Sequence, residues 1–138
     1  MNLHDKTITV LNKLKSSAST TKQDIWYKTV ITNCGWYVTS ISDMNGSNVV
    51  MSQTIKVMIP FSSKFLPYNE WKNAGMQIDH YTISRDDYII LGTVEEDITS
   101  SNILQVVQKY APDVCTVKSF RNLDKRVGNT IQLYVEGV

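Results

Sequence analysis

The sequence predicts a mostly β protein, a small antiparallel β-barrel or sandwich of six or seven strands with one late α-helix and a long aromatic loop. Aromatic and β-branched residues crowd into short runs, which is the composition that a pleated sheet prefers. Turn residues separate these runs, and a clear helical period occurs only once, after residue 99. A sheet this small buries its apolar face best by curling into a barrel or sandwich.

The first 24 residues are expected to form a flexible N-terminal arm, followed by a single β-rich domain over residues 25–138. Residues 7–14 fit a strand or a short helix, because their apolar positions match both spacings in part. Residues 15–24 are rich in Ser, Thr and Lys, which is typical of a loop.

The first clear strands are predicted over residues 25–32 and 36–41, with a bulge or corner at residues 33–35 between them. Asn45-Gly46 then predicts a hairpin turn, because both residues tolerate positive φ. The strand that returns from this turn spans residues 49–59, and its alternate apolar positions indicate one buried face.

Residues 61–79 are expected to form a long loop, because neither strand nor helix spacing persists there and Pro67 and Gly75 interrupt the segment. Aromatic residues are concentrated in it, and we expect them to reach a neighbouring subunit or a channel. The alternative is that these rings only cover the open end of the barrel. The candidate partner residues are Phe61, Phe65, Tyr68 and Trp71.

The last third of the chain is expected to hold short strands around the helix. Strands are predicted at residues 80–83, 88–94, 114–120 and 130–135. The helix is expected to begin at Thr99 or Ser100, which can cap it, and to end before Pro112. Its apolar face would be formed by Ile103, Leu104, Val107 and Tyr110.

Composition excludes several classes of protein. The net charge is +1, which gives no overall field that attracts nucleic acid or anionic membrane. The sequence shows no secretory signal and no apolar stretch of about 20 residues, so we expect no membrane association. Cys34 and Cys115 are too few and too far apart for a disulfide framework or a metal motif, and we expect reduced, half-buried thiols.

The sequence predicts no catalytic, metal or cofactor site, and we expect a protein that is not an enzyme. His4 and His80 have no cysteine or second histidine at ligand spacing. The acidic runs at residues 86–87 and 95–97 are expected to be solvated turn residues or charges at a helix start. A basic tip would face phosphates in a DNA channel or an acidic partner, or would only protect a strand edge from aggregation. Its residues are Lys118, Arg121, Lys125 and Arg126.

Several stretches resemble a family of small virion proteins from phages of Gram-positive bacteria. The resemblance begins at residues 26–36, continues through residues 87–94 and the helix, and closes at residues 116–120 and 134–138. It covers roughly residues 25 to 138. The family usually has Gly-Asp before its Tyr-Ile-Ile strand, where this chain has Asp86-Asp87, and Asp still suits a turn.

The resemblance implies a structural role in the neck of a tailed phage. Members are assigned to the minor capsid or head–tail region, and the order of elements is similar to that of head-closure (stopper) proteins. These form a homo-oligomeric ring between the portal or adaptor and the tail, around packaged double-stranded DNA. The expected location is the virion, with the host cytoplasm during assembly. A tail terminator or minor capsid protein is the alternative within this class.

A different alternative is a β-barrel that binds single-stranded nucleic acid. Exposed aromatic rings act as stacking platforms for bases in such proteins. The candidate rings in this chain are Trp26, Tyr27, Trp36 and Tyr37. The near-neutral charge weighs against this alternative.

Overall fold

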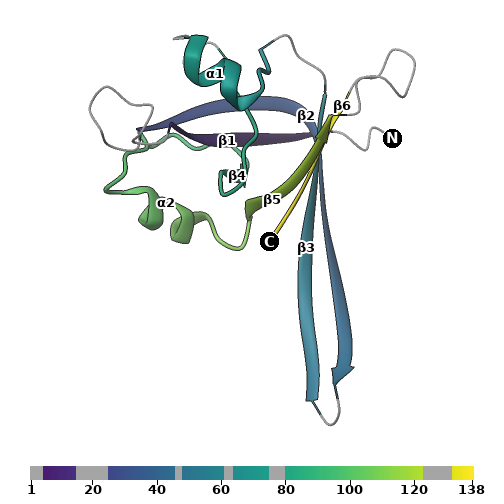
Figure 1. Cartoon of the computed structure of the whole chain (residues 1–138). Coiled ribbons are helices and arrows are strands. Elements are labelled where there is room, and N and C mark those ends of the chain that lie inside the picture. Colours follow the sequence, from purple (N-terminus) through teal and green to yellow (C-terminus); the bar gives the residue numbers. More distant parts are fainter. Residues whose placement is uncertain (1–4, 15–24, 46–47, 61–63, 75–79, 123–131) are drawn as a thin grey trace.

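In a computed structural model of the protein, antiparallel strands close into a barrel in the order β1-β2-β3-β6-β5-β4 (Figure 1). The structure describes residues 5–14, 25–45, 48–60, 64–74, 80–122 and 132–138. The predicted mostly β fold is confirmed, and its form is a closed barrel. Within the described residues the elements are β1 (Lys6–Leu14), β2 (Ile25–Asn45), β3 (Asn48–Pro60), α1 (Tyr68–Ala74), β4 (Tyr88–Leu91), α2 (Ile103–Tyr110), β5 (Val114–Asn122) and β6 (Gln132–Gly137).

Strand β1 shows that the prediction of a flexible arm over residues 1–24 is wrong for residues 6–14. These residues pair with β2 along their length and with β4 in the middle, so they form part of the barrel wall. Both faces of β1 are covered, since Val10 and Leu11 are each fully buried on opposite sides. A strand buried on both faces lacks a clean alternation, which is why its spacing also resembled a helix. Residues 1–4 and 15–24 lie outside the described residues.

The predicted corner at residues 33–35 is confirmed, and it joins the two predicted strands into the 21-residue strand β2. Asn33 has a φ of 60°, a left-handed conformation that Asn adopts more readily than most residues. The register between β1 and β2 shifts by one residue beside it. Before the corner β2 pairs with β1, and from Gly35 onward it pairs with β3.

The core is divided between the barrel interior and the space under α2. Alternate residues of the strands fill the interior, including Val57 and Ile89, and Tyr81 joins them from a connecting segment. On the outer side of the wall, Leu11 and Ile90 pack against Ile103 of α2. The wall formed by β1 and β4 is therefore apolar on both faces, and α2 has a fixed position against it.

Two predictions for the middle of the chain are corrected. The segment 61–79 was expected to be a loop, but it contains the short helix α1. Residues 80–83 were expected to form a strand, yet only Tyr81 pairs there, in an isolated parallel bridge to Phe65. The Tyr81 N–H donates to the Lys64 carbonyl, and the Tyr81 carbonyl accepts from the Leu66 N–H. These two hydrogen bonds hold the segment in place without a continuous strand pairing.

Helix α2 begins later than predicted, at Ile103, with Asn102 rather than Thr99 or Ser100 at the N-cap position. The Asn102 side chain accepts from the Thr99 N–H at 2.7 Å and donates to the Asp97 carbonyl at 2.7 Å, which organises the preceding turn. Ile103, Val107 and Tyr110 pack against the core as expected. Leu104 is 66% exposed, so its predicted place on the apolar face is wrong.

Candidate functional site

A two-stranded β-arm, residues 39–45 and 48–54, projects from the barrel (Figure 1). Its seven residue pairs run from Thr39 and Thr54 to the tip, a length of about 24 Å at ~3.4 Å per residue. Strand β6 joins β3 only from Ile55, and β1 leaves β2 at Cys34. In the described part of the chain, the two strands of the β-arm therefore pair only with each other, and each has an outer edge without a partner strand.

The sequence of the β-arm does not protect these edges. From residue 36 to residue 55 the only charged residue is Asp43, and the stretch contains no proline. Exposed edges are usually blunted by charges or proline, and an isolated two-stranded hairpin is marginally stable in water. At the base of the β-arm, Tyr37 and Val38 are 36% and 52% exposed. These features make the β-arm the best candidate for an interaction element.

A groove of about 400 Å³ lies in the barrel wall beside the corner at Asn33, and we call it the root groove. Residues 29–33 of β2 form one wall, and Pro60, Lys64 and Tyr81 complete the lining. Here β2 pairs with β1 on one edge, while pairing with β3 starts only at Gly35. The wall at residues 29–33 therefore has a second edge on the β3 side with no partner strand among the described residues.

The aromatic candidates of the segment 61–79 pack inward where the structure describes them. Trp71 is fully buried, and its indole N–H donates to the His80 carbonyl at 3.2 Å. Phe65 packs against the barrel core and makes edge contacts with Tyr81 and Phe120. Burial of the ring excludes contact with a neighbour, so the prediction that Trp71 reaches one is wrong, and the covering alternative fits it.

Two further candidates of this segment have different outcomes. Tyr68, at the start of α1, is half-buried, and its ring centroid lies 5.9 Å from that of Trp71. A half-buried ring still presents part of its surface to solvent, so its predicted contact with a partner stays a prediction. Phe61 lies outside the described residues.

The four rings expected to stack on nucleic-acid bases do not form a shared platform. Trp26 stacks on Tyr88 with centroids 5.6 Å apart, and Tyr27 meets Trp71 edge-on at 5.7 Å. Trp36 packs against the barrel core. Three of the four rings are thus engaged within the domain, and this arrangement does not favour the nucleic-acid alternative.

The predicted basic tip is described only in part. Lys118 and Arg121 lie on β5 and are exposed, while Lys125 and Arg126 are outside the described residues. Lys118 is the extra residue of a register shift between β5 and β6, and its ammonium lies 3.9 Å from the Asp86 carboxylate. This exposed pair adds little stability, and the cationic surface of the tip stays a prediction.

The two acids predicted to lie in a solvated turn have different environments. Asp86 is exposed and adopts a left-handed φ of 74°, as a turn residue does. Asp87 is only 2% exposed, so the prediction of a solvated side chain is wrong for it. Its carboxylate accepts from Asn12 Nδ2 at 3.0 Å and from the backbone N–H groups of Lys13 and Ser84 at 3.2 and 3.1 Å.

Asp87 and Asn12 together connect β1 to the segment before β4. The Asn12 amide also donates to the Thr82 carbonyl and accepts from the Thr82 N–H. Burial raises the pKa of Asp87 to about 7, while the hydrogen bonds from Asn12, Lys13 and Ser84 oppose the rise. All direct partners of the carboxylate are N–H donors, which suits a structural clamp.

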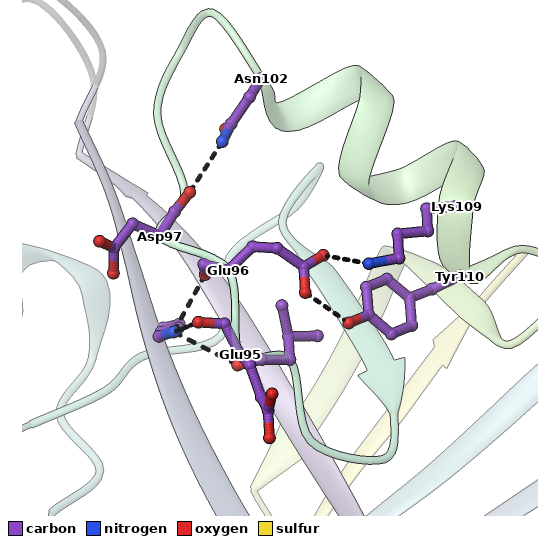
Figure 2. A network of polar contacts seen from close by, with 8 residues as sticks. Glu95, Glu96, Asp97, Asn102, Lys109 and Tyr110 are labelled. Carbon is purple, nitrogen blue, oxygen red and sulfur yellow. Dashed lines mark hydrogen bonds and ion pairs between the residues drawn. The ribbon is translucent and has the colours of Figure 1, made fainter.

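A second polar network fixes the segment between β4 and α2 (Figure 2). The Lys28 ammonium, from β2, donates to the carbonyls of Val94, Glu95 and Glu96 at 3.3, 3.0 and 3.0 Å. These contacts use all three donor positions of an ammonium group on backbone acceptors. The segment 94–96 is therefore held against β2 by one side chain.

The carboxylate of Glu96 connects the same segment to α2, as Figure 2 shows. It accepts from the Tyr110 hydroxyl at 2.8 Å and lies 3.3 Å from the Lys109 ammonium. The hydrogen bond from Tyr110 lowers the pKa of Glu96 and raises that of Tyr110. Glu96 was expected to be a charge at a helix start, whereas it bonds to residues in the last turn of α2.

The two cysteines lie in the barrel core and are more buried than predicted. Cys34 and Cys115 are both fully buried and free, and burial raises the pKa of each thiol to about 12. Within the residues that the structure describes, no three His, Cys, Asp or Glu side chains form a group able to hold a metal ion. No helix in the same part of the chain is long and apolar enough to cross a membrane.

Comparison with known proteins gives a family but no function. A model of a family of unknown function, DUF6751, matches residues 3–138. The chain belongs to this family. No curated protein and no solved structure matches the chain. The match includes β1, in agreement with the place of that strand in the barrel.

The β-arm is the feature that the sequence prediction missed, although a signal for it was present. The strands of the hairpin have 21 and 13 residues, whereas β1 and β6 have 9 and 6. Strands in a barrel match in length, so a hairpin that is much longer than its neighbours must extend beyond them. Of the predicted strands only residues 49–59 were clearly longer than the others, which was a partial signal for the projection.

Proposed function

We propose that the protein is a structural, non-enzymatic component of a tailed-phage virion, a head-closure protein that forms a ring between the portal or adaptor and the tail. The β-arm is the observation that supports this proposal most strongly. A closed barrel with a projecting hairpin that carries a single charged residue has one rigid body and one protrusion that needs a surface to pack on. A ring of identical subunits supplies such a surface at each contact.

The polar networks of the barrel support a structural role over catalysis. The Asp87 carboxylate accepts from N–H groups of two other segments. The Lys28 ammonium donates hydrogen bonds to three backbone carbonyls. Each network holds connecting segments in place, and rigid connections suit a protein whose activity is its shape.

The resemblance of residues 26–36 and 87–94 to small virion proteins supplies the biological setting. In that setting the ring surrounds packaged DNA and joins the head to the tail. The protein would be made in the host cytoplasm and end in the neck of the virion. The portal or adaptor on one side and a tail protein on the other would be its partners.

A gene-inactivated phage tests the proposal. Without the protein we expect filled heads that lose their DNA and remain without tails, seen by negative-stain microscopy and by DNase sensitivity of the genome. The wild-type chain should restore tailed particles. A chain with residues 41–52 replaced by Asn-Gly should not, while the control Gln105→Ala, on the exposed side of α2, should restore them.

Two results would contradict the proposal. Tailed, DNA-filled particles without the protein would exclude a role in head closure. Stable heads carrying tails of irregular length would instead indicate a tail terminator, because a terminator limits the growth of the tail. Labelling the protein in intact particles gives an independent readout, and we expect the label at the neck.

A further inference from the structure

Among the described residues, the outer edge of β3 in the β-arm has no partner strand. Residues 48–54 pair with β2 on one side, and β6 begins only at Ile55 on the other. These seven residues, NVVMSQT, contain no charge and no proline. The opposite strand of the β-arm carries Asp43 and is better protected from pairing. The β3 edge is therefore the more suitable of the two for adding a further strand.

The root groove provides an edge that can accept a strand. Its wall at residues 29–33 is a stretch of β2 whose β3 side has no partner strand among the described residues. The five residues of the wall can pair with five of the seven residues of the arm edge, and the groove beside them leaves about 400 Å³ for incoming side chains. A strand added to such an edge gains main-chain hydrogen bonds along its length.

One chain cannot join these two edges. The β-arm projects away from the barrel (Figure 1), whereas the root groove is lined by residues 29–33 of the barrel wall and by Pro60, Lys64 and Tyr81. The contact must therefore form between two molecules. Because the two surfaces differ, it is a head-to-tail contact, which is the type that generates rings.

Charge indicates a second copy of the chain rather than nucleic acid or a membrane. The β-arm has no basic residue to contact phosphates. Its one charged residue, Asp43, is acidic, and the one charged residue that lines the root groove is basic, Lys64. The β-arm and the root groove therefore carry charges of opposite sign, with Asp43 on the strand beside the pairing edge.

We infer that residues 48–54 of one copy pair with residues 29–33 of a second copy, in the root groove. This contact would be the joint between neighbouring subunits, and as a ring joint it rests on the proposed function. The pairing itself requires only two copies of the protein. It gives the β-arm the cover that its own barrel does not provide.

Cysteine cross-linking of the full-length protein tests the contact. Gln53→Cys on the β-arm is mixed with Val30→Cys in the root groove, and disulfide formation is followed on non-reducing gels. Both positions are exposed, and the native thiols are fully buried and add no background. The control mixes Gln53→Cys with Gln105→Cys on α2, which is also exposed.

We expect the Val30 pair to cross-link about a hundred-fold faster than the control pair at about 10 micromolar protein. Docking holds the two thiols at an effective concentration of about millimolar, which gives this ratio. Replacing residues 41–52 by Asn-Gly should also reduce the mass of the wild-type assembly to that of a monomer, measured by light scattering. Circular dichroism of each variant verifies that the barrel is folded.

Equal rates for the two pairs would overturn the inference, and so would a wild-type protein that is monomeric by light scattering. Assemblies that persist without the β-arm would also overturn it, while leaving a ring and the proposed function intact. The converse result separates the two claims as well. Rapid cross-linking of a protein that is absent from phage necks would support the contact and contradict the virion role.

Discussion

Asp87 makes the stability of the barrel depend on pH in an unusual direction. Burial raises its pKa from 3.8 to about 7, against the opposing effect of three N–H donors. Because the pKa in the folded state is the higher one, folding takes up a proton between about pH 4 and pH 7. The free energy of unfolding therefore falls as the pH rises through this window, and this contribution levels off above it.

The size of the effect follows from the two pKa values. One pH unit corresponds to about 1.4 kcal/mol, so the interval from 3.8 to about 7 corresponds to about 4 kcal/mol. Small domains have total stabilities of about 5–15 kcal/mol, so this contribution is large enough to measure. We expect urea midpoints to decrease from about pH 4.5 to about pH 7.5.

Comparison with Asp87→Asn isolates the contribution of this residue. The variant cannot ionise at position 87, so it should lack the Asp87 part of the pH dependence. It should also lose about 1–3 kcal/mol at low pH, because an amide places its own N–H groups against the donors of Asn12, Lys13 and Ser84. The neighbouring Asp86→Asn is the matched control, since its side chain is 65% exposed and Asn tolerates its left-handed backbone.

The result that would refute this reasoning is simple to recognise. If wild type and Asp87→Asn show parallel stability curves across the window, Asp87 ionises near its ordinary pKa. The three N–H groups would then outweigh burial, and Asp87 would act as a charged clamp. If Asp86→Asn alters the slope instead, Asp87 is not the source of the pH dependence.

Three further predictions concern the packing of the barrel. Lys28→Met leaves three carbonyls without their shared donor and should lower the unfolding free energy by about 1.5–3 kcal/mol in urea, whereas Lys109→Met, which breaks an exposed ion pair, should change it by less than about 1 kcal/mol. Gly137→Ala places a methyl group against the Thr116 carbonyl and Cys115 Sγ, and thermal unfolding should reveal a loss of about 1–3 kcal/mol or more. Cys34 and Cys115 should not react with a disulfide reagent at pH 8 until the protein is unfolded, because burial holds both thiol pKa values at about 12.

The sequence revealed the β-strands where their composition was unmistakable. The sequence predicted the strands around Trp26 and Trp36 and the strand that returns from Asn45. These segments are rich in aromatic and β-branched residues and contain few charged ones. Residues 6–14 were misassigned because β1 is buried on both faces, which removes the alternation on which strand prediction depends. The burial of Trp71 depends on tertiary contacts with Tyr27 and His80, which local spacing does not encode.

The candidate site was less predictable than the fold for a different reason. The polar groups that matter are joined across large separations, such as Asn12 with Asp87 and Lys28 with residues 94–96. From the sequence alone, two adjacent acids in a turn are predicted to be solvated. The burial of Asp87 becomes evident only when β1 is known to lie beside it. The β-arm, in contrast, depends only on strand length and charge, and both are readable in the sequence.

The corner at Asn33 separates the two tasks of β2. Before it, the strand is part of the barrel wall and offers the edge at residues 29–33; after it, the same strand leads into the β-arm. In the inferred contact, the receptor edge lies on β2 before this bend, and the donor edge lies on β3, which pairs with β2 beyond the bend. A fixed angle between the two surfaces of a head-to-tail contact determines whether successive copies close into a ring or continue as a filament. The geometry of the corner, rather than the strength of the contact, would then set the number of subunits.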